Sequence, residues 1–183
     1  MIIHSRDVPD YPAMERLVVD AWGEIAPGVK ILDRRVKVGS GEHLDFLCAD
    51  SEGRLVIADL AIREGDGILV RALRHTAWIF DHMSLLRKAY RNENLLHDAS
   101  PRLLLIAPGF STNLRESLSA LAGTEVTLIA VRYGEVNNEP ALWIDPVPTP
   151  RPAPPASAYR PARRSSKLRL TEKELLHFIQ RQP

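Results

Sequence analysis

Cysteine is nearly absent from the sequence, and the one thiol, Cys48, stands in an apolar stretch. A single cysteine forms no internal disulfide, so a disulfide scaffold is excluded and Cys48 is expected to be a small buried residue. The longest apolar runs are about six residues, far short of the roughly 20 that span a bilayer. The first residues lack a basic region followed by an apolar stretch, so no secretory signal is predicted. A cytoplasmic protein without a membrane partner is expected.

Three common kinds of functional site also have no signature in the sequence. The six histidines form no His-x-x-x-His pair and no pairing with cysteine, so no zinc site is expected. The loop 39–43 lacks the Gly-Lys-Ser/Thr ending of a phosphate-binding loop, and no G-x-S-x-G motif is present. Serine-hydrolase chemistry is therefore not supported, and no organic cofactor is expected.

The composition is that of an ordinary globular protein, with 45% apolar and 26% charged residues. A chain of 183 residues is long enough for one domain with a substantial core and a short appendage. The net charge of +1 hides an uneven distribution: residues 149–183 carry +6, which leaves −5 for residues 1–148. Any attraction to phosphate from bulk charge is therefore expected in the C-terminal part.

Hydrophobic periodicity predicts an α/β domain over residues 1–146. The expected elements are a helix at 12–26, strands at 30–38, 43–50 and 54–62, a helix at 68–91, a strand at 102–109, a helix at 110–123, and strands at 125–134 and 140–147. A hairpin followed by α/β alternation predicts a mixed central sheet flanked by helices. The long helix is expected to bury one apolar side, made of Leu69, Leu73, Ala77, Phe80, Leu85 and Ala89.

The C-terminal part predicts a linker and a short helix. Seven of the fourteen prolines lie in residues 146–161, so residues 147–169 are expected to form an extended Pro/Arg-rich linker. Residues 170–183 predict an amphipathic helix that Thr171 caps and that is too short to persist alone in water. This helix should dock on the core of its own chain or on a partner, and a homodimer formed through it is one expectation.

Two acids stand among apolar residues in the predicted hairpin 43–62. Because strand side chains alternate in direction, Asp59 and Ala61 share one face of their strand, as does Arg63 if the strand continues. If the turn brings Asp45 close to Asp59, the two negative charges need a cation between them. Mg²⁺ is commonly held by one or two carboxylates. The alternative is that both acids face water at the ends of their strands.

The element order and the hairpin resemble the PD-(D/E)XK nuclease superfamily, which has the restriction-endonuclease-like fold. The similarity is greatest to the nuclease domain of EndoMS-type mismatch endonucleases and covers residues 12–145. It is carried by the stretches RRVKVGSGEHLDFLCADSEGRLVIADL, RALRHTAW and RLLLIAPGFSTNL. The resemblance implies that Glu15, Asp45 and Asp59 surround a catalytic Mg²⁺ or Mn²⁺, with Asp45 and Asp59 as its ligands. It also implies DNA as the partner.

The sequence departs from the family pattern at positions that catalysis needs. The family lysine falls on Ala61, and the helix positions where the family often has Gln and Tyr fall on Arg71 and His75. The lysine places a fixed positive charge beside the attacking water, and losing one such donor typically costs ~10²–10³ in rate. Arg63, Arg71 and His75 are the candidates for a replacement cation.

Three functions are therefore open. The first is a degenerate nuclease-fold protein that binds nucleic acid or a partner and cleaves weakly or not at all. The second is an active Mg²⁺-dependent DNA endonuclease with a relocated cation, and the third is an interaction module that forms a homodimer. Candidate nucleic-acid contacts are Arg34, Arg35, Arg160, Arg163, Arg164, Lys167 and Arg169. The last five of these residues could equally belong to a solvated tether.

Overall fold

The computed structural model describes residues 3–5, 10–39, 41–96, 99–121, 123–136 and 139–149, all within one compact unit, Met1–Ala153. The predicted helix at 170–183 and nearly all of the predicted linker lie outside the described residues. The domain boundaries expected at 146 and 169 therefore stay predictions.

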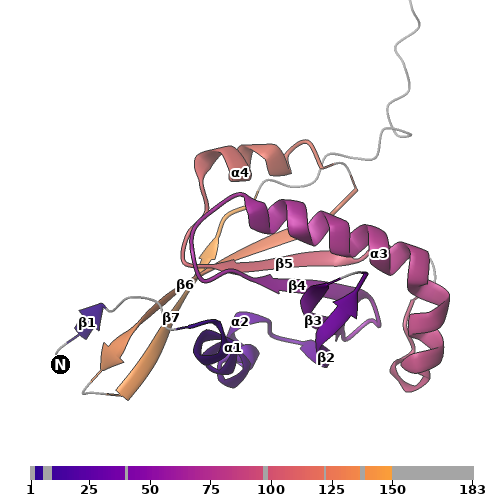
Figure 1. Cartoon of the computed structure of the whole chain (residues 1–183), viewed down its shortest axis with the longest axis horizontal. Helices are drawn as coiled ribbons and strands as arrows, with labels where there is room; N and C mark the ends of the chain where they lie inside the picture. The colour runs from indigo at the N-terminus through magenta and orange to yellow at the C-terminus, as the bar shows by residue number, and fades with distance from the viewer. Residues whose placement is uncertain are drawn as a thin grey trace, which may run out of the picture. The chain divides into compact units, whose positions relative to one another are not determined.

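The described elements follow the predicted order, with an additional strand near the N-terminus, an additional 3₁₀ turn, and two short helices in place of the single helix expected at 12–26 (Figure 1). They are β1 (Ile3–Ser5), α1 (Tyr11–Asp20), α2 (Trp22–Ile25), β2 (Val29–Val38), β3 (Glu42–Asp50), β4 (Leu55–Leu60), α3 (Gly67–Ala89), the 3₁₀ turn η1 (Arg91–Glu93), β5 (Arg102–Ala107), α4 (Thr112–Leu118), β6 (Val126–Val136) and β7 (Glu139–Val147). The three residues of β1 are too few to show a periodicity, so the sequence did not predict this strand.

All seven described strands form one mixed sheet. β2, β3 and β4 pair antiparallel, β4, β5 and β6 pair parallel, and both β1 and β7 pair antiparallel with β6. α3 connects β4 to β5 and α4 connects β5 to β6, which are the crossovers that parallel neighbours need. The predicted α/β class, with a mixed central sheet flanked by helices, is confirmed.

The helices cover both faces of the sheet, α1 and α2 on one side and α3 and α4 on the other (Figure 1). One apolar cluster lies beneath α3 and α4, where Ile57 and Leu105 are fully buried. A second cluster lies beneath α1 and α2, where Met14 and Phe46 are fully buried. Burial on both faces explains why β4 and β5 are almost continuously apolar in sequence.

The side that α3 buries overlaps only partly with the one that the sequence predicted, since Leu69 is shared by both. Its buried residues are Ile68, Leu69, Ala72, His75, Ile79 and Leu86. Phe80 and Leu85, which the periodicity places on the buried side, are 51% and 58% exposed. An apolar stripe of α3 therefore faces the sheet, and beside it Arg71 and His75 contact acids of the sheet. Among the described helices, none is long and apolar enough to cross a bilayer.

Candidate functional site

The hairpin of β3 and β4 places Asp45 and Asp59 where the two strands stop pairing. Phe46 and Ala58 form the last pair of the ladder, so each aspartate lies one residue beyond its end. Strand alternation turns both side chains toward the face that α3 covers. The backbone N–H of Leu60, which lies beyond the last backbone pair of β3 and β4, donates to Asp45 Oδ2 at 2.7 Å. The two acids predicted from the sequence therefore lie at the same point of the sheet.

α3 places Arg71 and His75 on these acids, from positions one turn apart. Arg71 Nη2 donates to Asp45 Oδ2 at 3.0 Å and to the Leu60 carbonyl oxygen at 2.8 Å. Arg71 Nε lies 3.4 Å from Asp59 Oδ1, which is ion-pair distance. His75 Nδ1 lies 2.9 Å from Asp59 Oδ2 and donates to it, since a carboxylate oxygen accepts. Four of the predicted site residues, Asp45, Asp59, Arg71 and His75, thus form one polar group, here called the carboxylate cluster.

The carboxylate cluster is almost closed to solvent. Asp59 is 0% exposed, His75 1% and Asp45 7%, whereas 31% of the Arg71 side chain stays accessible. Burial raises the pKa of Asp45 above its ordinary value and the Asp59 charge adds to this, while hydrogen-bond donors and the Arg71 charge oppose it. An unpaired charge is costly in such surroundings, so Arg71 compensates for the burial of both carboxylates.

Tyr11, the first residue of α1, is a further member of this site that the sequence did not indicate. Its buried hydroxyl interacts with the Asp45 carboxylate without forming a hydrogen bond of regular geometry. Burial, followed by the charge of Asp45, raises the pKa of Tyr11 well above its ordinary value. The phenol therefore stays protonated at working pH. No motif marks this tyrosine, and only the tertiary packing brings it to Asp45.

Glu15 lies on α1, one turn after Tyr11, and its charge acts on that phenol. It is half-buried and lines an open groove between α1 and β2. The described part of the chain contains no group of three or more Asp, Glu, His or Cys side chains placed to hold a metal ion. The structure therefore brings together two of the three expected carboxylates, and a metal-related role for Glu15 stays a prediction.

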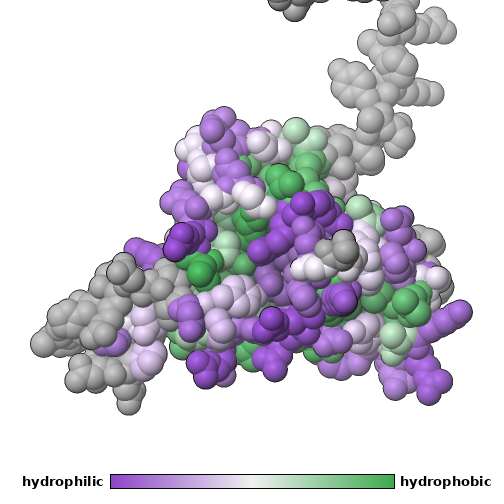
Figure 2. Space-filling model, in the orientation of Figure 1, coloured by the Kyte–Doolittle hydropathy of each residue, from purple (hydrophilic) through white to green (hydrophobic). Residues whose placement is uncertain are grey.

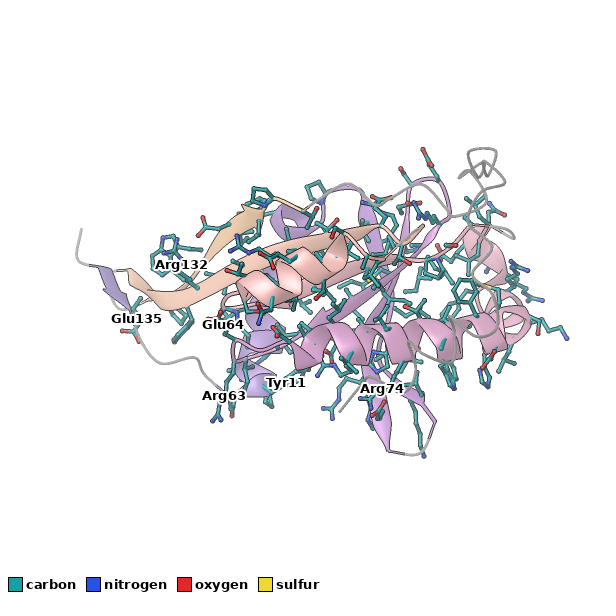
Figure 3. All side chains as sticks on the ribbon, turned by 90° about the horizontal axis from the view of Figure 1, so that it is seen from above. Tyr11, Arg63, Glu64, Arg74, Arg132 and Glu135 are labelled. Atoms are coloured by element: carbon teal, nitrogen blue, oxygen red, sulfur yellow. The ribbon has the colours of Figure 1, made fainter. Side chains whose placement is uncertain are left out.

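The lysine position of the family pattern carries only a methyl group. Ala61 follows the end of β4, its N–H donates to the Ile106 carbonyl oxygen at 2.8 Å, and its side chain packs on the apolar cluster beneath α3. Because β4 ends at Leu60, Arg63 lies in the following loop and not on the strand. Arg63 is exposed, at the same end of the molecule as Tyr11 (Figure 3). A role for Arg63 in place of the lysine stays a prediction.

Arg34 and Arg35 are exposed residues of β2 that line the groove between α1 and β2, whose volume is about 770 Å³. Arg16 joins them from α1, so three arginines stand beside two acids, Glu15 and Asp33. Figure 2 shows hydrophilic side chains gathered on the visible face between these two elements. The other candidate nucleic-acid contacts, Arg160, Arg163, Arg164, Lys167 and Arg169, lie outside the described residues.

Arg35 has a backbone conformation that side chains disfavour, with a φ of 53°. An L-residue in the left-handed region costs roughly 1–2 kcal/mol, and glycine avoids that cost. We therefore expect Arg35→Gly to raise the free energy of unfolding by about 1 kcal/mol in urea denaturation. Arg34→Gly is the matched control, and it should lower stability because glycine weakens an extended strand. A loss of stability in Arg35→Gly would show that side-chain contacts outweigh the strain.

A divalent metal ion does not fit the carboxylate cluster as it stands. Mg²⁺ requires about six oxygen ligands in near-octahedral geometry. Asp45 Oδ2 already accepts hydrogen bonds from Leu60 and Arg71, and Asp59 Oδ2 accepts one from His75. The Arg71 guanidinium lies between the two carboxylates, where a shared metal ion would have to bind, and its positive charge repels such an ion. Groups of the protein itself therefore occupy one oxygen of each predicted ligand and place a positive charge between the two carboxylates.

No protein-family model and no curated protein match the chain. Among solved structures, it is 24% identical to EndoMS in a complex with double-stranded DNA, over 64% of this chain and 43% of that one, with a TM-score of 0.40. It is 25% identical to apo EndoMS, over 64% and 46% of the two chains, with a TM-score of 0.39. It is 20% identical to a repair endonuclease from Pyrococcus abyssi, over 67% and 48%, with a TM-score of 0.42. The chain thus spans less than half the length of these proteins, and membership of the PD-(D/E)XK superfamily stays a proposal.

Proposed function

We propose that this chain is a degenerate nuclease-fold protein that binds nucleic acid and cleaves it weakly or not at all. The observation that carries the proposal is the methyl group of Ala61, which packs on apolar side chains where the family pattern has a lysine. A methyl group supplies neither a proton nor a positive charge to a reacting phosphate. Losing one such donor typically costs ~10²–10³ in rate, so any remaining hydrolysis is expected to be slow.

An active metal-dependent endonuclease would need another group to take over the role of the lysine. Arg71 and His75 are the candidate cations that reach the acids. The guanidinium of Arg71 does not release its proton at working pH, so it does not relay protons. His75 is 1% exposed, and its Nδ1 is held by Asp59. A substrate would therefore not reach His75 without rearrangement of the site, and both observations favour the degenerate protein over the active enzyme.

The groove between α1 and β2 supports nucleic acid as the partner. Within the described part of the chain, no ion pair involves the side chains of Arg16, Arg34 or Arg35, so their charges are available for phosphate oxygens. Arginine binds phosphate through two parallel N–H donors, which suits it to a nucleic-acid backbone. The core carries a net negative charge, so binding there depends on this local cluster and on the basic C-terminal part of the chain.

Arg34→Ala is expected to weaken binding of duplex DNA and to reduce its salt dependence. Each phosphate contact contributes about 0.9 to the slope of log K against log salt concentration, so losing one contact should lower the slope by about that amount. Fluorescence anisotropy between about 50 and 200 mM salt measures both quantities. Arg132→Ala is the control. Arg132 lies on β6, away from Tyr11 at the start of α1 (Figure 3), and its side chain pairs with Asp145. Equal losses in both variants would show that DNA does not use the groove.

A cleavage assay tests the proposed function directly. Full-length protein and its Asp45→Ala variant are incubated with Mg²⁺ or Mn²⁺ and branched, mismatched or single-stranded DNA. We expect DNA binding but no turnover above background for either protein. Clear turnover that Asp45→Ala abolishes would instead establish an active endonuclease. If the protein binds no DNA even at low salt, and if deleting residues 149–183 converts a dimer into a monomer, the interaction module is the better account.

A further inference from the structure

We propose that the guanidinium of Arg71 is a built-in cation that takes the place of the metal ion at Asp45 and Asp59. The chain as it stands would then hold no divalent metal ion between these residues. The inference rests on the proposed function, because it explains how a nuclease-like fold keeps its two central carboxylates without their metal. It goes beyond the proposed function by assigning the displacement of the metal ion to one side chain, that of Arg71, which a mutation can remove.

The position of the guanidinium is the first argument. Nη2 lies 3.0 Å from Asp45 Oδ2, and Nε lies 3.4 Å from Asp59 Oδ1, so one planar group reaches both carboxylates. Arginine is suited to this arrangement because its donors are fixed in a fork and its charge is permanent. A metal ion shared by the two acids would have to lie in the space that the guanidinium fills.

The backbone contacts of the same atoms are the second argument. Arg71 Nη2 also donates to the Leu60 carbonyl oxygen at 2.8 Å, while the Leu60 N–H donates to Asp45 Oδ2 at 2.7 Å. Asp45 therefore accepts from the N–H of Leu60, and Arg71 donates to its carbonyl oxygen. Both backbone polar groups of Leu60 are thus paired at the point where β3 and β4 separate. Arg71 is held by three oxygen atoms from two strands, so its position is part of the fold and not a loose surface contact.

The charge of the cluster is the third argument. The two carboxylates lie in nearly dry surroundings, and like charges held close need a cation. Arg71 supplies one positive charge to both, and His75 Nδ1 donates to the second oxygen of Asp59. Asp59 Oδ1 is buried without a hydrogen bond and faces Arg71 Nε, so it is the atom that an incoming metal ion would use first. With Arg71 removed, this oxygen and the Asp45 carboxylate lose the cation that they share and become available as acidic ligands.

Isothermal titration calorimetry with Mn²⁺ tests the proposal on full-length wild-type protein, Arg71→Ala and Arg74→Ala. Arg74 lies further along α3 (Figure 3) and pairs with Glu42 at 2.9 Å, so its removal takes the same charge from the same helix without touching the cluster. We expect Arg71→Ala to bind Mn²⁺ roughly tenfold or more tightly than wild type and Arg74→Ala, because the free carboxylates add ligand charge. Adding Asp59→Asn to Arg71→Ala should abolish the gain.

Wild-type protein that binds Mn²⁺ as tightly as Arg71→Ala, and loses it on Asp45→Asn, would overturn the proposal. If Arg71→Ala fails to fold, Arg71→Gln keeps a polar side chain of similar length, and the wild-type titration decides the question without any variant of Arg71. DNA binding and cleavage are measured on the same samples. If the wild-type protein binds neither Mn²⁺ nor DNA, the proposed function is refuted and the built-in cation is not. If the wild-type protein binds Mn²⁺ through Asp45 but does not cleave DNA, the built-in cation is refuted and the proposed function is not.

Discussion

Arg71→Ala is expected to lower the free energy of unfolding by about 3 kcal/mol in metal-free buffer. Removing one partner of a buried ion pair typically costs ~3–5 kcal/mol, because the other partner stays buried without compensation. The lower end applies here, since 31% of the Arg71 side chain is exposed. For a chain of this size the loss corresponds to a fall in Tm of roughly 6–12 °C. Urea denaturation in the presence of EDTA, followed by circular dichroism, measures it.

Two further variants show whether the loss of stability in Arg71→Ala comes from buried negative charge. Arg74→Ala breaks an ion pair whose side chains are 59% and 44% exposed, so it should cost no more than about 1 kcal/mol. Adding Asp45→Asn to Arg71→Ala should recover at least about 1 kcal/mol, because asparagine keeps an acceptor for the Leu60 N–H and removes the charge. Equal, small losses in Arg71→Ala and Arg74→Ala would contradict the central place of Arg71 in the cluster.

The double variant Ala61→Lys/Arg71→Gln is expected to cleave DNA in Mg²⁺ about 10²-fold faster than Arg71→Gln alone. Removing the guanidinium frees Asp45 and Asp59 for a metal ion, which neutralises phosphate and activates water. The introduced amine then supplies the fixed positive charge that Ala61 lacks, and one such donor is worth ~10²–10³ in rate. Single-turnover cleavage of a labelled mismatched duplex measures the difference.

A control variant built on Ala61→Lys/Arg71→Gln shows whether the new DNA cleavage arises at Asp45 and Asp59. Adding Asp45→Ala to the double variant should abolish cleavage, because it removes one of the two freed ligands. A double variant that binds Mn²⁺ at Asp45 and Asp59 but shows no more turnover than Arg71→Gln would contradict the proposal that Ala61 accounts for weak or absent cleavage.

The hairpin at the centre of the candidate site could be predicted from the sequence because it depends on local geometry, whereas Arg71 and His75 are indicated only by the family resemblance. The turn between β3 and β4 fixes the register of the hairpin, and the period of two in a strand then turns Asp45 and Asp59 to the same face. Arg71 and His75 lie one turn apart on the next helix, so they present their side chains to one neighbour. The contact between the two pairs follows once the helix crosses that face of the sheet.

The remainder of the site could not be predicted, because it depends on tertiary packing. Tyr11 reaches Asp45 only through the docking of α1 on the sheet, and the same docking places Glu15, one turn later, in the groove between α1 and β2. The sequence also places Phe80 on the buried side of α3, whereas the structure buries the stripe that contains Ile68, Ala72, Ile79 and Leu86. The choice between these two overlapping apolar stripes depends on tertiary packing, which periodicity alone does not contain.

Anomalous X-ray diffraction from crystals of the wild-type protein soaked in Mn²⁺ tests the central claim most directly, because it locates the ion and Arg71 in the same map. The account predicts no anomalous peak between Asp45 and Asp59, with the guanidinium of Arg71 in contact with both carboxylates. A manganese peak at coordination distance from the two aspartates, with the Arg71 side chain turned away, would contradict it.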